Sequence, residues 1–282
     1  MIQLLLQYEF VQNAFLAGTI VAIVTAVIGY FVVLRSQAFA GHALSHIGFA
    51  GATGAAILGI SSFLGTFAFT LLAALGMGAL GERVRGRDLE IGMVLSFALG
   101  LGVLFLSVYT RYATATVNIL FGSILSVARS DVLLMLCCGI ATLLLTSFLY
   151  RPLLFASIDP EVALARGVPV RMLSVLFMFL LAITISEAVQ VVGVLLVFAL
   201  LVAPAATAGR LTHQPFTAIV LSVALGLIFT WSGLILAFVA RLPVSFYIAA
   251  LAALSYFASV LISRVRSPRR YKEPAHPSRE CK

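Results

Sequence analysis

Apolar stretches separated by short polar segments repeat along the whole chain. Charged residues are nearly absent from nine of them, at about 11–34, 38–60, 63–80, 91–109, 132–150, 172–187, 189–208, 215–239 and 243–263. A helix needs about 20 mostly apolar residues to cross the hydrocarbon core of a membrane. The pattern therefore predicts an all-α, polytopic membrane bundle of about eight to nine transmembrane helices within residues 1–263.

The composition supports this fold class and limits the function. Hydrophobic residues make up 62% of the 282 residues and charged residues 10%, whereas soluble domains are about half apolar and a quarter charged. The chain lacks a G-x-x-x-x-G-K-[ST] phosphate loop, and its only lysines, Lys272 and Lys282, lie near the C-terminus. We therefore expect no ATP hydrolysis by this chain, and no pairing of a nucleophile with a base predicts another enzyme activity.

The basic residues predict how the bundle is oriented. If the nine runs alternate across the membrane, one side receives 15 of the 18 lysines and arginines. Because cytoplasmic loops are enriched in these residues, that side and the C-terminus are predicted to be cytoplasmic, at the inner (plasma) membrane. The basic tail, 264–282, contains prolines and no apolar face, so it is predicted to be disordered beside anionic lipid. Membrane orientation explains the net charge of +8, and no nucleic-acid partner is expected.

One apolar segment, 113–128, is too short for an ordinary crossing and contains Asn118. It is predicted to be a re-entrant or interfacial helix, which would affect the number of crossings.

His42 and His46 are the main candidates for a functional site. They are four residues apart, so on a helix both imidazoles project from one face and can bind one cation. They follow Arg35 by 7 and 11 residues, which places them roughly 10–17 Å into the membrane, where polar residues are usually functional. The alternative is that each histidine only bonds a neighbouring helix. Many glycines and alanines surround the pair and predict close packing of this helix.

Two further residues are candidates with open interpretations. Glu187 is predicted to lie at an outer turn, either as a solvated carboxylate or as a metal-attracting group at the outer mouth of a pathway. Pro204 interrupts the hydrogen bonding of the seventh run, and the kink is either a hinge or an ordinary feature of a membrane helix.

The segment SIDPEVALARGVPVRML is the most soluble-looking stretch inside the chain. Asp159 can cap a short helix that begins at Pro160, with Glu161 in its first turn and Gly167 at its end. We predict a short cytoplasmic helix, which is either an ordinary loop helix or a docking element for a soluble partner.

Four blocks of sequence resemble a known family. They are His42 to Gly54, FGSILSVARSD (121–131), IDPEVALARGVPV (158–170) and VQVVGVLLVFALLVAPAATAGRL (189–211). Together they resemble the permease subunits of ATP-binding-cassette importers for zinc, manganese and iron. The resemblance implies a homodimer that forms the pathway, a dimer of cytoplasmic ATPase subunits and an extracytoplasmic metal-binding protein. Residues 158–169 resemble the coupling helix that inserts into the ATPase, with Asp159, Pro160, Glu161, Ala165 and Gly167 as contact candidates.

The resemblance also places the family's pathway ligands at His42 and His46. Members of the family typically have Asp-x-x-x-His here, so the first ligand has changed from oxygen to nitrogen. Imidazole suits zinc and iron better than manganese, so zinc is the favoured cargo, with no permanently bound cofactor. Two alternatives are a permease for metal chelates such as siderophores or haem, and an ion-coupled secondary carrier that needs no ATPase.

Overall fold

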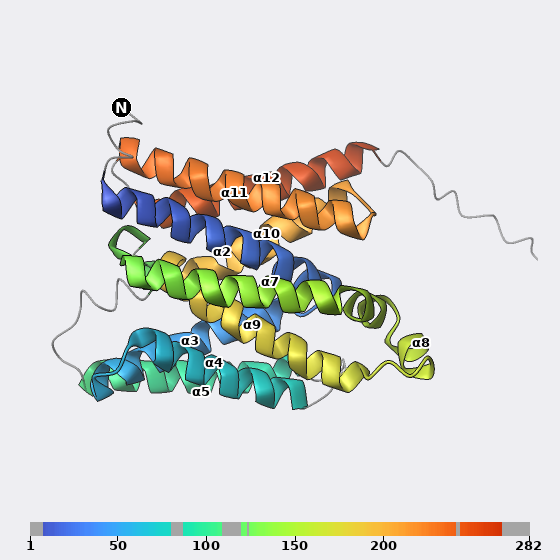
Figure 1. Ribbon diagram of the computed structural model, residues 1–282, viewed down its shortest axis with the longest axis horizontal. Coiled ribbons are helices and arrows are strands. Elements are labelled where there is room, and N and C mark those ends of the chain that lie inside the picture. The colour runs from blue at the N-terminus through green and yellow to red at the C-terminus, as the bar shows by residue number, and fades with distance from the viewer. Residues whose placement is uncertain (1–7, 80–86, 109–119, 123, 241–242, 267–282) are drawn as a thin grey trace, which may run out of the picture.

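The computed structural model describes residues 8–79, 87–108, 120–122, 124–240 and 243–266. In these ranges the chain is helical and contains no strand (Figure 1). The nine long helices are α2 (Glu9–Leu34), α3 (Ala38–Leu58), α4 (Ser62–Ala79), α5 (Arg87–Val108), α7 (Arg129–Ile158), α9 (Val170–Val192), α10 (Val194–Leu211), α11 (Pro215–Ala240) and α12 (Val244–Arg266). Two short elements complete the described part, η1 (Ile124–Ser126) and α8 (Pro160–Ala165).

Each of the nine apolar runs corresponds to one long helix, so the predicted all-α bundle is confirmed. The largest difference is in α7, which was expected to end at about residue 150 and continues to Ile158. Arg151 is a good helix former, and Pro152 removes only one hydrogen bond of a long helix. Charge therefore marks where this helix leaves the apolar region and not where it ends.

The helices form two groups, which are joined by α9 and by contact of α3 with α10. In one group α3 packs against α4 and α5, and α4 also packs against α9. In the other group α10 contacts α2, α11 and α12, while α7 lies against α2 and α9. Figure 1 shows α11 and α12 along one edge of the bundle and α3, α4 and α5 along the opposite edge. This arrangement places α3 where α9 and α10 both reach it.

Seven of the helices are long and apolar enough to cross a membrane. The outer surfaces of α5, α7, α11 and α12 carry large exposed apolar side chains such as Phe97, Phe148, Phe216 and Phe257. Residues of this kind at the surface of a long helix are typical of contact with lipid. α3 is not among the seven, because glycine, alanine and two histidines lower its hydropathy, and it is largely covered by its neighbours.

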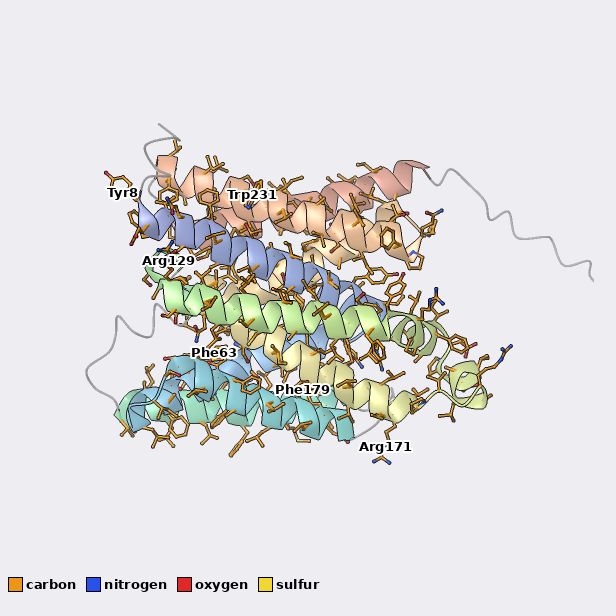
Figure 2. The ribbon with its side chains drawn as sticks, in the orientation of Figure 1. Tyr8, Phe63, Arg129, Arg171, Phe179 and Trp231 are labelled. Carbon is orange, nitrogen blue, oxygen red and sulfur yellow. The ribbon has the colours of Figure 1, made fainter. Side chains whose placement is uncertain are left out.

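The two ends of the bundle differ in charge. Figure 2 shows Arg129 near Tyr8 at one end and Arg171 at the other end. Arg35 lies at the same end as Arg171, since its guanidinium donates to the Ser174 hydroxyl of α9. The chain enters and leaves the bundle at opposite ends (Figure 1), as an odd number of crossings requires. That the Arg171 end faces the cytoplasm remains a prediction.

Two predicted features fall largely outside the described ranges. Residues 267–282 of the basic tail are not described, although α12 continues to Arg266, three residues beyond the predicted span. Of the predicted re-entrant segment, only residues 120–122 and 124–128 are described, and they contain the 3₁₀ turn η1 packed against α2 and α9. The re-entrant course of this segment therefore remains a prediction.

Candidate metal site

Close packing through glycine fixes the position of α3, as its small residues predict. The strongest contact joins Gly51 to Gly65 of α4, where a β-carbon on Gly51 would lie 2.2 Å from the Gly65 carbonyl oxygen. On the other side, a β-carbon on Gly102 of α5 would lie 2.7 Å from the Phe49 ring. Such contacts exclude any larger side chain at these positions. The helix that carries the two histidines is therefore held on both sides by protein.

His42 and His46 lie on one face of α3, as their spacing predicts. Their ring centroids are 4.6 Å apart and their planes make an angle of 79°. Two imidazole nitrogens bound to one zinc ion at about 2.0–2.1 Å must lie within roughly 4 Å of each other. The separation of the rings is compatible with a shared ion after small side-chain rotations. The pair can therefore supply two nitrogen ligands from one chain.

Both imidazoles are half-buried and reach the outer face formed by α3 and α10. Phe198 of α10 packs edge-on against His42, with ring centroids 5.1 Å apart. On the same face, one turn from these rings, Phe39 and Leu195 are exposed. The histidines are therefore not enclosed by packing within a single chain. Among the described residues, no group of three or more His, Cys, Asp or Glu side chains could hold a metal ion, so the pair has no third ligand of this kind there.

The predicted position of Glu187 is wrong. The helix does end at a tight turn at Gly193, but Glu187 lies more than one turn before it and is only 1% exposed. Its carboxyl oxygens have no hydrogen-bond partner in the described part of the chain. The side chain is directed at α7, since a β-carbon on Gly139 would lie 3.8 Å from its Oε2 atom. Glu187 is therefore buried between helices, neither solvated at a turn nor at an outer mouth.

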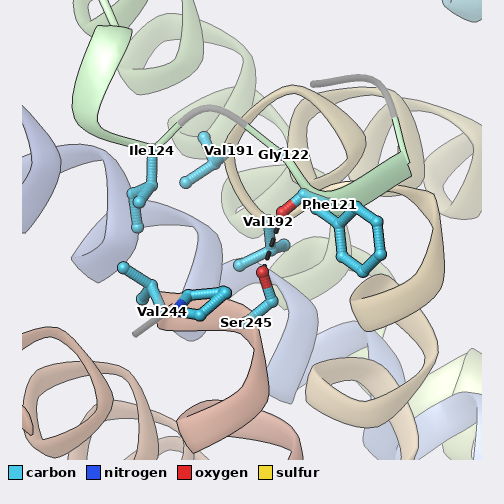
Figure 3. Close-up of a pocket in the computed structure, with 8 residues that line it drawn as sticks. Phe121, Gly122, Ile124, Val191, Val192, Val244 and Ser245 are labelled. Carbon is cyan, nitrogen blue, oxygen red and sulfur yellow. Dashed lines mark hydrogen bonds between the residues drawn. The ribbon is translucent and has the colours of Figure 1, made fainter. Parts of the chain in front are cut away.

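The turn between α9 and α10 is fixed by two glycines in the left-handed region. Gly193 has a φ of 79° and Gly122 a φ of 76°, and a β-carbon on Gly193 would lie 2.2 Å from the Gly122 nitrogen. An apolar cavity of about 200 Å³ lies beside this contact, where Ser245 donates to the Phe121 carbonyl at 2.9 Å. Figure 3 shows the residues that line it. No ionisable side chain lines this cavity. It is therefore not a second candidate for cation binding.

The short helix predicted near residue 160 is present as α8, at the end of the bundle that carries Arg171 (Figures 1 and 2). Asp159 caps it by accepting a hydrogen bond from the Val162 nitrogen at 3.0 Å. Gly167, with a φ of 81°, ends the turn that leads into α9. Ala163 is fully buried, whereas Leu164 is 65% exposed. The element is therefore anchored on one side and presents an apolar side chain on the other.

Comparisons with known proteins identify the family. A family model described as the ABC 3 transport family matches residues 7–263. The chain belongs to this family. It is similar to the manganese transport system membrane protein MntC of Listeria monocytogenes, with 34% identity over 92% of each chain. It is also 35% identical, over 74% of this chain and 77% of that protein, to a probable iron transport system membrane protein of Haemophilus influenzae.

A solved structure agrees with this assignment. The structure of PsaBC from Streptococcus pneumoniae in complex with Fab matches 92% of this chain and 93% of that chain, with 32% identity and a TM-score of 0.82. The resemblance found in the sequence is thereby confirmed, and this ABC 3 family protein is a multi-span permease and a transport component. Membership in a family of ATP-binding-cassette transport proteins argues against the alternative of an ion-coupled secondary carrier.

Some contacts of this ABC 3 permease could not be found by sequence reasoning. Phe198 lies in the block 189–211 that resembles the family. The hydrophobic pattern of that block does not show that Phe198 contacts His42 on another helix. The same holds for the hydrogen bond of 2.8 Å between Thr70 and Ser186, which joins α4 to α9. Pro204 is confirmed to lie inside α10 and is buried, and its role as a hinge remains a prediction.

Proposed function

We propose that two copies of this chain form the pathway of an ATP-driven plasma-membrane importer for divalent transition-metal ions. The observation that carries the proposal is the histidine pair, His42 and His46, whose rings lie together on an outer face of the single chain, at a position predicted to be deep in the membrane. A bare divalent ion is very unstable in hydrocarbon, so the pathway must supply ligands in place of water. One chain provides two imidazoles, and a symmetric pair of chains would provide four.

Similarity to named relatives changes which metal ion we propose as the cargo. Their names refer to manganese or iron, so the prediction of zinc finds no support among them. Imidazole at position 42 suits iron better than manganese, because manganese prefers oxygen ligands. We therefore place iron and manganese before zinc as the ions to be tested. An extracytoplasmic metal-binding protein would deliver the ion, as the family resemblance implies.

The transport test uses vesicles that contain the permease with its ATPase, supplied with ATP, the delivery protein and each ion in turn. Replacing both His42 and His46 by alanine is expected to reduce metal accumulation by at least about tenfold, because both ligands are lost. Ser45→Ala is the matched control, since Ser45 lies between them in the sequence, is fully buried and, within the described ranges, donates a hydrogen bond only to the Gly41 carbonyl of its own helix. Unchanged accumulation in the double variant, at equal protein level, would contradict the proposal and favour a pathway for chelates.

Energy would enter through α8. Val162 and Leu164 are exposed on this helix, and Ile158 is exposed just before it, so an apolar surface stands beyond the ends of the spans. Such a surface fits a groove on a soluble ATPase. Leu164→Ser is expected to reduce recovery of the ATPase with the purified permease by about tenfold, the effect of one strong interface residue. Leu211→Ser, also at the Arg171 end and exposed, should leave recovery unchanged, and equal recovery with both variants would contradict docking at α8.

A further inference from the structure

A second cavity lies at the Arg171 end of the bundle, away from the histidine pair. It has a volume of about 530 Å³, is open to the surface, and is lined by α2, α10, α11, α12 and the loop that follows α10. Its apolar wall comes from Val33, Leu34, Ala205, Ala206, Gly209 and Ala218, and its polar wall from Tyr30, Arg210, Thr212, His213 and Tyr256. Every polar side chain in this wall can donate a hydrogen bond, and none is a carboxylate. The lining therefore favours an anion.

Arg210 is oriented by an aromatic ring and not by an acid. Its guanidinium donates to the Tyr256 hydroxyl at 3.2 Å, and its Cζ atom lies 5.2 Å from the centre of the same ring. No acidic side chain pairs with Arg210 in the described part of the chain. Contact with an aromatic ring leaves the charge of an arginine uncompensated and most of its donors available. The cavity thus presents a full positive charge to whatever occupies it.

The surroundings of the cavity indicate which anion would reach it. Leu211 and Phe257, which follow Arg210 and Tyr256 in the sequence, are 39% and 63% exposed, and Phe216, three residues after His213, is 71% exposed. They continue the apolar outer surface of α11 and α12 to the end of the bundle. A ligand that enters here meets basic donors beside an apolar wall and an apolar rim. This combination matches a phosphate group attached to acyl chains, because a small soluble anion would leave most of the apolar wall uncovered.

We propose that this cavity binds the phosphate group of an anionic phospholipid, with Arg210 and His213 on the phosphate and the glycerol and first acyl carbons against Val33 and Ala206. Charge-assisted bonds from a guanidinium to phosphate oxygens are among the stronger ones in proteins. The lipid would join α2, α10 and α12, which meet around the cavity. This site is separate from the metal pathway and does not depend on the identity of the cargo.

The test measures how lipid changes the thermal unfolding midpoint of the purified full-length protein in detergent. Phosphatidylglycerol is expected to raise the midpoint of the unaltered protein more than phosphatidylcholine does. Arg210→Gln and His213→Gln should each weaken the response to phosphatidylglycerol by about tenfold in lipid concentration. Arg171→Gln is the matched control, because Arg171 is exposed at the same end and lines neither described cavity.

Native mass spectrometry of the same four proteins provides a second measurement. Retention of phosphatidylglycerol should fall in Arg210→Gln and His213→Gln and be kept in Arg171→Gln. His213 is exposed in a loop, so its variant tests the site even if Arg210→Gln fails to fold. Equal responses of all four proteins, or equal responses to both lipids, would overturn the proposal. Loss of the phosphatidylglycerol effect in millimolar inorganic phosphate would assign the cavity to a soluble phosphate compound and overturn the lipid assignment.

Discussion

Gly51 of α3 and Gly65 of α4 lie in direct backbone contact, so closely that a β-carbon on either would come within 2.2–2.3 Å of the other's carbonyl oxygen. This contact sets how near the histidine-bearing helix can approach α4. Because both obstructing atoms belong to backbone, no side-chain rotation can relieve an added methyl group.

We therefore expect Gly51→Ala to destabilise the protein by about 1–3 kcal/mol, the range for overpacking of a well-packed interior. Thermal unfolding in detergent would measure this as a lowered midpoint. Gly76→Ala is the control, because Gly76 lies in α4 with nothing within 4 Å of an added β-carbon, and alanine favours helix there. A lowered midpoint for both variants would show that the contact between the two glycines is not the cause.

The second prediction concerns metal selectivity. Replacing His42 by aspartate, the residue that the family resemblance implies here, exchanges a nitrogen ligand for an oxygen ligand. Manganese prefers oxygen ligands, so its uptake relative to zinc should rise by roughly tenfold, an effect typical of changes around a bound metal. Uptake of mixed ions into vesicles, followed by elemental analysis, measures the ratio. An unchanged ratio with both ions still transported would show that His42 does not contact the ion.

The third prediction concerns the buried carboxylate of Glu187, whose oxygens have no partner in the described ranges. Exchanging an uncompensated buried acid for an apolar side chain of similar volume is often stabilising, so Glu187→Leu should raise stability by about 1 kcal/mol or more. Metal uptake should be unchanged, because the side chain is directed at Gly139 of α7 and not at the histidines. Loss of uptake in a well-folded Glu187→Leu protein would instead place this carboxylate in the pathway.

The sequence predicted the fold well because crossing a membrane places strong demands on each segment. Every apolar run became one helix, and the spacing of His42 and His46 was enough to place both rings on one face. The error at Glu187 had a definite cause. Glu187 was assigned to a turn because it interrupts the otherwise uncharged stretch between Arg171 and Arg210, which is barely long enough for two spans, yet the chain turns at Gly193. Local sequence does not show that Gly139 of another helix leaves room for this side chain.

The cavity at the Arg171 end was also not predictable from the sequence, because it depends on contacts between distant segments. The cavity lined by Tyr30, Arg210 and Tyr256 joins residues from three helices that are far apart in the chain. Each of these residues alone is ordinary for the end of a membrane helix, where aromatic and basic side chains are common. Only the packing of α2, α10 and α12 brings them to one cavity. The short helix α8 was predictable because its cap, first proline and final glycine are neighbours in sequence.

The last prediction concerns Pro204, which is buried ten residues after the start of α10. A proline inside a helix lacks the N–H that would bond the carbonyl four residues earlier, here that of Leu200, and so weakens the helix locally. If α10 bends here as the pathway opens and closes, Pro204→Ala should stiffen that motion. We expect slower metal uptake per ATP hydrolysed and a higher unfolding midpoint, since proline costs about 3 kcal/mol relative to alanine in a helix interior.

Pro152→Ala in α7 is the matched control for this hinge. Pro152 is the other proline found inside a described helix. Among the described residues, no aromatic ring of α7 contacts His42 or His46. Its unfolding midpoint should also rise, while uptake per ATP stays unchanged. Measuring both quantities in the same vesicles separates the effects, because stiffening of α10 changes the coupling ratio and simple stabilisation does not. If Pro204→Ala behaves like Pro152→Ala in both measurements, Pro204 is a tolerated break in α10 and not a hinge.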